Sequence, residues 1–404
     1  MPFDRRAWLH ATTLAQHGYA VSFICPKGRG FDRSREMLDG VDIHRYWRPI
    51  EGEGKLAFIA ESLWCFFATL LLSLRIGLFG RGFDILHICN PPEIYWPMAW
   101  FWRMLGKIFI FDHRDLSPEL AAAKFGAGDG RIMSILYWLE RLTFRAAQIV
   151  VATNESYKRI AIERGKKRPE DVFIVRSAPS LAKFQLYDPD PAFKQGKPHL
   201  ILYLGEIGPQ DGVDNLIRAI KVLRDERGRS DFHCILIGGG TNQPTVAAYA
   251  AAEGVADLCT FTGIVSDEML CRILSSADVG IDPLPKNDWS DKSTMNKVLE
   301  YMFFGLPIVV GELTEARVSA GEAALYVEPG NPQAMAEGIA TLLDDPERRQ
   351  KMGGFGQLRL RNELAFEYSV PNLLAAYDAA WARVGHSFWR NGGLSLTKPA
   401  DLSR

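Results

Sequence analysis

Short apolar runs alternate with segments of helical periodicity along almost the whole chain. In the first half, the apolar runs predict strands at residues 20–25, 41–46, 85–88, 108–112, 149–152 and 172–175. After a polar stretch at 177–198, the pattern restarts with predicted strands at 200–204, 232–237, 258–261, 278–281, 308–310 and 324–327. Strands that alternate with helices favour an α/β fold with parallel sheets, because a parallel connection needs a crossover helix.

The restart divides the chain into two Rossmann-like, doubly wound domains that face each other across a cleft. We expect a first domain at residues 1–176, a linker at 177–198 and a second domain at 199–365. Helical periodicity at 332–343, 346–362 and 370–383 closes the chain, and we expect a helix at 366–384 to pack back on the first domain. The tail at 385–404 has no periodicity, so we expect it to be mobile.

The start of the chain departs from the usual order of elements in such a domain. A Rossmann-like domain opens with a strand that becomes the centre of its sheet. Here residues 4–8 already predict the first helix, and residues 19–25 correspond to the second strand. The absent strand would leave two unpaired edges. We therefore expect the natural protein to begin about twenty residues upstream, with Met1 as an internal methionine.

Two apolar stretches bear on localisation. The run at 63–74 is about a dozen residues long, whereas a membrane span needs about 20, so we expect no transmembrane helix. Residues 94–111 place three tryptophans beside Arg103 and Lys107, which is typical of a lipid interface and equally of a domain core. Residues 1–10 lack the apolar core of a secretory signal. We expect a cytoplasmic protein, with peripheral contact to the inner face of the cytoplasmic membrane as an open alternative.

The composition is that of a globular protein, with 47% hydrophobic and 24% charged residues. Residues 1–175 contain 24 Lys and Arg against 19 Asp and Glu, and the remainder contains 23 against 29. These imbalances are too small to predict a nucleic-acid partner. The six cysteines form no Cys-x-x-Cys pair and no metal-type spacing with histidine, which favours free thiols in a reducing compartment.

The segment 290–307 concentrates polar chemistry at a predicted helix start. Ser293 or Thr294 suits the N-cap of a helix that starts near Met295. Helical spacing predicts a buried stripe of Met295, Val298, Leu299, Met302 and Phe303, which leaves Lys297 and Glu300 together on another face.

This helix start has the chemistry of a nucleotide diphosphate site. Free amides at a helix start favour an anion, Lys292 and Lys297 add cations, and Glu300 is able to accept hydrogen bonds from a ribose. A surface ion pair between Lys297 and Glu300 on an ordinary capped helix explains the same residues. Glycine-bearing loops at 205–212, 238–240 and 263–265 also follow predicted strands, so we expect four loops at one ligand-binding sheet edge.

Six segments together carry a family pattern: residues 2–6, 88–92, 112–120, 153–157, 205–214 and 292–305. With them the chain resembles, over nearly its whole length, the family 4 retaining glycosyltransferases of the GT-B fold, in particular the bacterial cell-surface polysaccharide branch. The resemblance implies a metal-independent, hexosyltransferase-type enzyme with no cofactor. It implies a nucleotide-diphosphate sugar as donor and a glycan, lipid-linked in our expectation, as acceptor.

The resemblance also implies roles for particular residues. Glu300 would hold the ribose, Ser293, Thr294 and Lys297 the diphosphate, and Val265 the base. The full set of implied donor-binding residues is Gly205, Gly239, Val265, Lys292, Ser293, Thr294, Lys297 and Glu300.

In the first domain, the resemblance implies that Asp112, His113 and Arg114 face the transferred sugar, with His113 or Arg114 stabilising the departing phosphate or orienting the sugar. Asp112 and Asp115 would alternatively cap the following turn. Arg5, Arg6 and Asn90 are implied on the acceptor side. His87 lies nearby, but a lone strand histidine is more often satisfied inside the fold.

The chain departs from the wider family in two loops. That pattern pairs two glutamates eight residues apart, but Lys292 stands eight residues before Glu300. The family's usual arginine and lysine in the glycine loop correspond here to Glu206 or Ile207 and to Asp211. A cation is thus lost from one loop and gained in another, and we expect Lys292 to replace the lost charge beside the diphosphate.

Two other functions stay open. A nucleotide-sugar epimerase would need acid and base groups around the sugar and no acceptor. A non-catalytic nucleotide-sugar-binding subunit would explain both Lys292 and the absent opening strand. For the transferase, no Asp-x-Asp follows a strand to hold a divalent ion, and we expect domain closure about residues 177–198 to exclude water from the donor.

Overall fold

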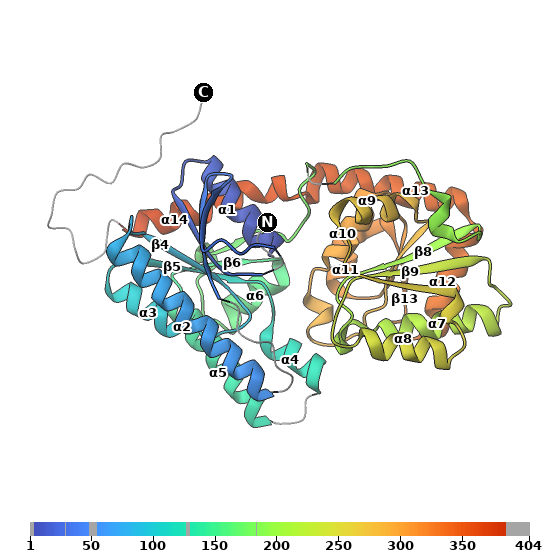
Figure 1. The fold of residues 1–404 in the computed structure, drawn as a ribbon, viewed down its shortest axis with the longest axis horizontal. Coiled ribbons are helices and arrows are strands. Elements are labelled where there is room, and N and C mark those ends of the chain that lie inside the picture. The colour runs from blue at the N-terminus through green and yellow to red at the C-terminus, as the bar shows by residue number, and fades with distance from the viewer. Residues whose placement is uncertain (1–3, 29, 48–54, 127–129, 183, 385–404) are drawn as a thin grey trace. The chain divides into compact units, whose positions relative to one another are not determined.

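The computed structural model describes residues 4–28, 30–47, 55–126, 130–182 and 184–384, with only the backbone described at 55–59 (Figure 1). The predicted tail at 385–404 lies outside the described residues. The chain divides into two units. Unit 1 comprises residues up to 117, 131–175 and those from 370 onward, and unit 2 comprises 118–130 and 176–369. The predicted α/β class with parallel sheets is confirmed.

Unit 1 contains two sheets. In the larger one, β4 (Ile85–Cys89), β5 (Ile108–His113), β6 (Ile149–Ala152) and β7 (Val172–Ile174) are parallel neighbours in that order. The smaller sheet pairs β1 (Val21–Pro26) with β3 (Val41–Tyr46), and β2 (Arg35–Leu38) joins β3 antiparallel. Among the described residues no strand pair joins β1 to β4, which is where a Rossmann-like sheet has its central strand.

The helices of unit 1 are α1 (Arg5–Gln16), α2 (Lys55–Phe79), α3 (Trp96–Met104), α4 (Ser117–Phe125, most of which groups with unit 2), α5 (Gly130–Ala146), α6 (Glu155–Glu163) and the C-terminal α14 (Val370–Val384). α14 packs on β5, β6 and β7. It is tied there by Tyr377, whose hydroxyl lies 2.8 Å from Nδ1 of His87, and by the ion pair of Arg383 with Asp171.

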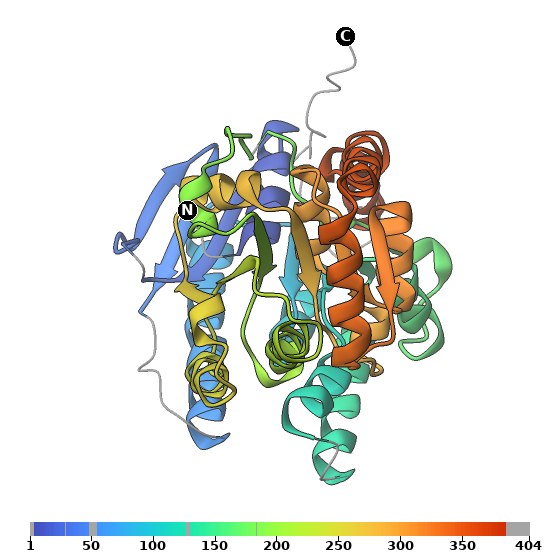
Figure 2. The same cartoon turned by 90° about the vertical axis from the view of Figure 1, so that its right-hand side faces the viewer.

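Unit 2 is one parallel sheet in the order β10-β9-β8-β11-β12-β13. Its strands are β8 (His199–Leu204), β9 (Phe232–Ile237), β10 (Cys259–Gly263), β11 (Val279–Asp282), β12 (Ile308–Gly311) and β13 (Ala324–Val327). Its helices are α7 (Val213–Asp225), α8 (Gln243–Ala252), α9 (Asp267–Ser276), α10 (Asn296–Phe303), α11 (Thr314–Ala320), α12 (Pro332–Asp344) and α13 (Pro346–Arg359). Helices cover both faces of the sheet (Figures 1 and 2), and every residue of β9 is buried, as expected for a central parallel strand.

Every predicted strand overlaps an observed one. The additional strand β2 was not predicted, because its residues are mostly exposed and carry no apolar run. A second difference concerns α2. The apolar run at 63–74 is part of a longer segment, Ala60–Phe79, whose mean hydropathy is 1.8 and of which 11% is buried. By length and composition alone this helix is able to cross a membrane, so the length argument against a span no longer holds.

Candidate functional site

The sheet of unit 2 has a topological switch point between β8 and β11. From β8 the chain proceeds through β9 and β10 to one edge, and then returns to build β11, β12 and β13 on the other side. Ligands of open α/β sheets bind in the crevice outside the carboxyl ends of the strands at such a point. The residues at these two ends are the Gly205 loop after β8 and Asp282 at the end of β11.

Lys297 lies between these two strand ends. Its Nζ is 3.4 Å from Oδ1 of Asp282 and 3.4 Å from the Tyr203 hydroxyl, and 4.5 Å from the centre of the Tyr203 ring. A Cβ placed on Gly205 would lie 3.0 Å from Cε of Lys297. The lysine therefore supports the Gly205 loop directly.

This lysine is buried, which corrects the prediction that it shares a surface with Glu300. Lys297 is 7% exposed and pairs with Asp282, whereas Glu300 is half-buried. Burial opposes the charged form, but Tyr203 and the Asp282 carboxylate outweigh it and raise the pKa of Lys297. The positive charge is consequently permanent and acts from beneath the loop rather than from solvent.

Tyr301 is part of the same cluster and was not singled out in the sequence analysis. Its hydroxyl accepts from the amide of Leu204 at 2.8 Å and donates to the carbonyl of Ile281 at 3.1 Å, so it joins β8 to β11. Its spacing of four residues from Lys297 places both on one helical face, and that spacing was the available signal.

The glycines of two loops are required by close backbone packing. A Cβ on Gly238 would lie 1.8 Å from the carbonyl oxygen of Gly205, and a Cβ on Gly240 would lie 2.4 Å from that of Ile207. Gly205 and Gly238 also have φ of +146° and +131°, which other residues rarely adopt. Gly239, which lies between Gly238 and Gly240 in the chain, is half-buried. Val265, which follows the end of β10, is also half-buried. These predicted donor positions share one sheet edge.

The start of α10 differs from the prediction. The helix begins at Asn296 with Met295 as N-cap, and no side chain caps it. Ser293 is buried and its hydroxyl donates to the Trp289 carbonyl at 2.6 Å, while Thr294 is half-buried. A turn at residues 290–292 takes up these polar side chains before the helix starts, which is why the N-cap prediction was wrong.

Lys292 and Asp211, two of the residues that depart from the family pattern, have different surroundings. Nζ of Lys292 lies 3.1 Å from Oδ1 of Asp288, in a pair whose lysine side chain is 34% exposed. Asp211 is buried, and its Oδ2 accepts from the Gly208 amide and the Gln210 side chain, both at 2.9 Å. Burial raises the pKa of Asp211 to about 6. Asp211 thus closes the glycine loop on itself.

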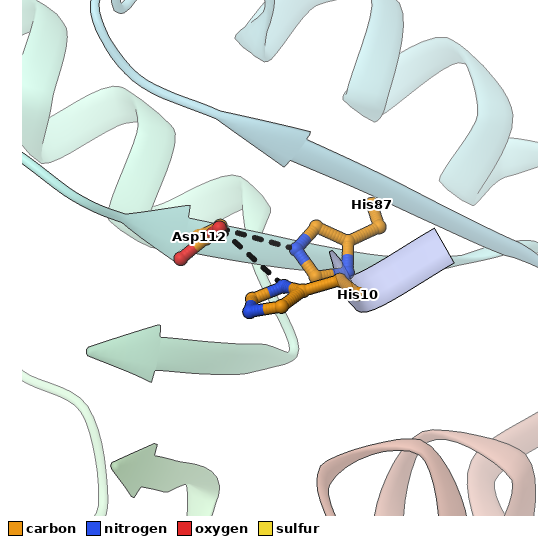
Figure 3. Close-up of side chains that lie close together, drawn as sticks. All are labelled: His10, His87 and Asp112. Atoms are coloured by element: carbon orange, nitrogen blue, oxygen red, sulfur yellow. Dashed lines mark ion pairs between the residues drawn. The ribbon is translucent and has the colours of Figure 1, made fainter. Parts of the chain in front are cut away.

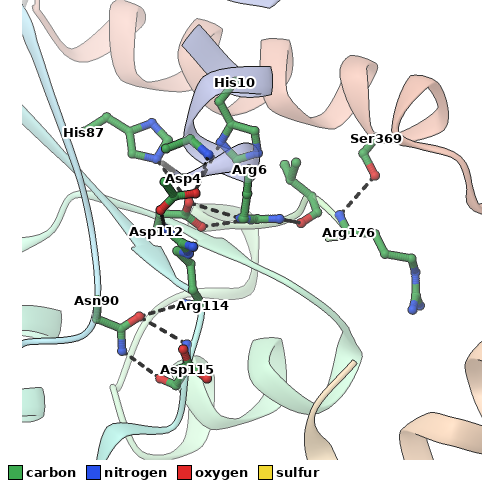
Figure 4. A network of polar contacts seen from close by, with 12 residues as sticks. Asp4, Arg6, His10, His87, Asn90, Asp112, Arg114, Asp115, Arg176 and Ser369 are labelled. Atoms are coloured by element: carbon green, nitrogen blue, oxygen red, sulfur yellow. Dashed lines mark hydrogen bonds and ion pairs between the residues drawn. The ribbon is translucent and has the colours of Figure 1, made fainter. Parts of the chain in front are cut away.

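In unit 1, Arg6 and Asp112 form a buried ion pair (Figure 4). Nη2 and Nε of Arg6 donate to the two oxygens of Asp112 at 2.9 and 3.2 Å, and Nη1 donates to the Val175 carbonyl at 2.8 Å. Burial opposes ionisation of Asp112, but Arg6 and His87 hold its pKa well below the usual range. Asp112 is 1% exposed and both of its oxygens bind Arg6. The predicted contact with a sugar and the alternative role as a turn cap were therefore both wrong.

His113 does not fit its predicted role at the transferred sugar. It is fully buried, because successive residues of a strand point to opposite faces and His113 points away from Asp112 into an aromatic cluster of Phe111, Phe144 and Tyr157. Neither ring nitrogen has a hydrogen-bond partner among the described residues. Burial lowers the pKa of His113 to about 3, so the ring is neutral at physiological pH.

Arg114 and Asn90 lie at the carboxyl ends of β5 and β4. Arg114 pairs with Asp4 and is partly exposed. Asn90 is buried and organises the following loop: its Oδ1 accepts from the Arg114 amide at 2.7 Å, and its Nδ2 donates to the Asp115 carbonyl at 2.7 Å. Of the predicted acceptor-side residues, Arg6 and Asn90 are therefore structural, whereas Arg5 is exposed.

Glu93 is a buried acid that the sequence pattern did not indicate. It accepts hydrogen bonds from Asn90 Nδ2 at 2.6 Å and from the Ser117 hydroxyl. Burial raises the pKa of Glu93, and these two donors oppose that shift.

Among the described residues, one cluster offers metal-type ligands: His10, His87 and Asp112, whose ligand atoms lie within 4.8 Å of one another (Figure 3). The Arg6 guanidinium lies 2.9 Å from the same carboxylate and would repel a divalent ion. The cluster fits an internal ion-pair network better than a metal centre, and metal independence stays a prediction.

Two family models match the chain, one described as a glycosyl transferase 4-like domain at residues 4–176 and one as glycosyl transferases group 1 at 198–345. The D-inositol 3-phosphate glycosyltransferase of Thermomonospora curvata is 24% identical over 395 residues, which cover 92% of this chain and 88% of that relative. Sucrose-phosphate synthase from Thermosynechococcus elongatus has a similar fold, with a TM-score of 0.74, 17% identity and 93% of each chain covered. Anabaena Alr3699/HepE, solved in complex with UDP-glucose, matches with a TM-score of 0.64 and 14% identity, over 84% of this chain and 87% of that one.

Proposed function

The chain belongs to the family 4 glycosyltransferases, and we propose that it moves a sugar from a nucleotide-diphosphate sugar to a lipid-linked glycan in the assembly of a bacterial cell-surface polysaccharide. In this proposal the transfer retains the anomeric configuration, uses no metal or other cofactor, and takes place in the cytoplasm with peripheral contact to the inner face of the cytoplasmic membrane. The complex of Alr3699/HepE with UDP-glucose supports a nucleotide sugar as donor.

One observation carries the proposal. A permanently charged lysine, Lys297, lies beneath a glycine loop at the switch point of unit 2, 3.0 Å from where a Cβ of Gly205 would be. Glycine lets the backbone approach a phosphate closely, and a cation below it favours an anion above it. This arrangement supports a diphosphate at the carboxyl ends of β8 and β11.

In the reaction, the bond between the anomeric carbon and the diphosphate oxygen breaks, the oxygen of the acceptor hydroxyl forms the new glycosidic bond, and its proton passes to the departing diphosphate. Negative charge grows on the leaving diphosphate. Lys297, the start of α10 and Lys292 would stabilise that charge, which is the largest task for the protein in such a step. Glu300 would accept hydrogen bonds from the ribose.

Donor binding and acceptor-dependent turnover test the proposal. We expect one UDP- or GDP-sugar to raise the melting temperature of the protein and to release nucleotide only when a lipid-linked acceptor is present. Gly238→Ala would place a Cβ 1.8 Å from the Gly205 carbonyl oxygen and should abolish donor binding. Gly354→Ala, where a Cβ meets nothing within 4 Å, is the matched control in the same unit.

Four outcomes contradict parts of the proposal. Tight donor binding without transfer to any acceptor would favour a non-catalytic subunit, and sugar isomerisation without acceptor would favour an epimerase. An inverted anomeric centre in the product, read by NMR, would exclude retention. Loss of activity after chelator treatment, restored by a divalent ion, would exclude metal independence.

A further inference from the structure

Helix α2 exposes an apolar stripe along its length. Trp64, Phe67, Leu71 and Leu78 follow one another at helical spacing and are 47%, 56%, 66% and 55% exposed. A soluble helix normally turns such a stripe to the core and charged residues to solvent. Here the segment Ala60–Phe79 has mean hydropathy 1.8 and is only 11% buried, so it is a surface helix with the composition of a membrane segment.

The opposite face of α2 is attached to α3. Nε1 of Trp102 donates to the Ser73 hydroxyl at 3.1 Å, Ile76 is buried, and a Cβ on Gly77 would lie 2.2 Å from the Trp102 ring. These contacts hold the helix on unit 1. Crossing a bilayer would require breaking them and exposing Trp102, which is 1% exposed.

Helices α3 and α5 extend the exposed apolar surface. The rings of Trp96 on α3 and Trp138 on α5 are in edge contact, with centroids 6.3 Å apart. α3 therefore contacts both other helices, α2 through Trp102 and α5 through Trp96. We define the apolar face as the exposed large apolar residues of these helices: Leu63, Trp64, Phe67, Leu71, Leu78, Phe79, Trp100, Met104, Ile132, Ile135 and Trp138.

An apolar groove lies between α2 and α3. It has a volume of about 230 Å³ and is lined by Phe66, Leu70, Leu74, Pro97, Met98 and Phe101. A groove without polar lining residues suits a hydrocarbon chain and offers nothing to a polar ligand.

The exposed charges on the described parts of these three helices have one sign. On the described parts of α2, α3 and α5, the exposed charged side chains are all arginines: Arg75, Arg131, Arg141 and Arg145. A second copy of the chain would bring these like charges together across a two-fold interface. An anionic lipid surface instead attracts them, at about 1 kcal/mol for each arginine near the surface.

We propose that the apolar face lies in the plane of an anionic phospholipid bilayer, with α2 parallel to the surface and a hydrocarbon chain of the bilayer in the α2–α3 groove. This proposal assigns a particular surface to the membrane contact of the proposed function. Only its biological purpose rests on that function. It makes the protein monotopic: the face enters the lipid by the depth of its side chains, and the sheet of unit 1 stays in water.

Vesicle binding by the full chain tests this assignment. We expect it to co-sediment with phosphatidylcholine vesicles that contain phosphatidylglycerol, and to be released by alkaline carbonate. Replacing Phe67→Gln and Leu71→Gln together should weaken binding by about tenfold or more, because both side chains lose apolar burial in lipid. Leu358→Gln is the matched control, since Leu358 of unit 2 is 64% exposed and lies outside the face.

The charge component is separable from the apolar one. Arg141→Ser should weaken binding to phosphatidylglycerol vesicles about fivefold at low salt, and should leave the weaker binding to pure phosphatidylcholine unchanged. All variants should melt as the wild type does, because the replaced side chains are exposed.

Several results would overturn the assignment. Equal binding by the Phe67/Leu71 variant and the wild type would reject the face, and resistance to carbonate would mean that α2 spans the bilayer. A wild-type dimer in solution that the same variant dissociates, without vesicle binding, would make the face an interface between copies. Assaying transfer to a water-soluble acceptor analogue separates membrane binding from the transferase proposal. Vesicle binding without any transfer would support the apolar face as a membrane surface and reject the transferase.

Discussion

The buried pair of Lys297 and Asp282 makes a quantitative prediction. Its Nζ and Oδ1 atoms are 3.4 Å apart, and the two side chains are 8% and 0% exposed. At that distance and an effective dielectric constant near 20, the attraction is about 5 kcal/mol, most of which offsets the cost of removing both charges from water. The net value of the pair is therefore small, but the penalty for breaking it is large.

Lys297→Met removes the charge and keeps a side chain of similar shape. The Asp282 carboxylate would then be buried without a counter-charge, and its Oδ2 already has no hydrogen-bond partner among the described residues. We expect the free energy of unfolding of unit 2 to fall by about 3–5 kcal/mol. Asp282→Asn should also destabilise the unit. The double variant should be more stable than the sum of the two changes predicts, by about 2 kcal/mol or more.

Hydrogen exchange is the suitable assay, because a chain of two units does not unfold in one transition. Amides of β8 and β11 report on the pair, and those of β5 and β6 in unit 1 are the internal reference. Additive effects in the double variant, or unchanged protection of β8 and β11 in Lys297→Met, would refute the reasoning.

Three further changes have signed expectations. His113→Phe should preserve transferase activity and remove a source of acid destabilisation. The folded pKa of His113 is about 3 and the unfolded value is 6.5, so the wild type loses about 3 kcal/mol of stability as pH falls towards 4. The variant should keep that stability, as urea titrations would show. Arg6→Met should destabilise unit 1 by about 3–5 kcal/mol near neutral pH, where Asp112 is ionised, while Arg5→Met at an exposed position should change melting little. Asp211→Asn should flatten the pH dependence of unit 2. The folded pKa of Asp211 is about 6 against 3.8 unfolded, so its contribution to stability is complete below pH 3.8 and falls by roughly 3 kcal/mol as pH rises to and through 6. Exchange of the Gly208 amide would measure this loss.

Lys292 lies in a loop for which we propose donor binding, and it forms an ion pair with Asp288. Its side chain is 34% exposed and pairs with Asp288, so stability should not change in Lys292→Ala. Donor KM should rise instead, and Lys286→Ala, which removes a lysine that is 57% exposed and pairs with Asp291, is the control.

The sequence by itself determined the fold class, the positions of the predicted strands and the sheet edge at which the glycine loops lie. Those features depend on hydrophobic period and on glycine, which are local properties that the chain order expresses directly. The position of Lys297 in a family segment also predicted a role for it at the phosphates, and the structure places it beside the Gly205 loop at that sheet edge.

Tertiary structure decided what each polar side chain does. His113 and Asp112 are adjacent in sequence, but strand alternation sends one into an aromatic cluster and the other to Arg6, which lies 106 residues away in the chain. Likewise Lys297 is a buried support and not a surface cation, because β8 and β11 meet at the switch point and enclose it with Tyr203 and Asp282. Partners that are distant in sequence set burial, and burial sets both pKa and accessibility.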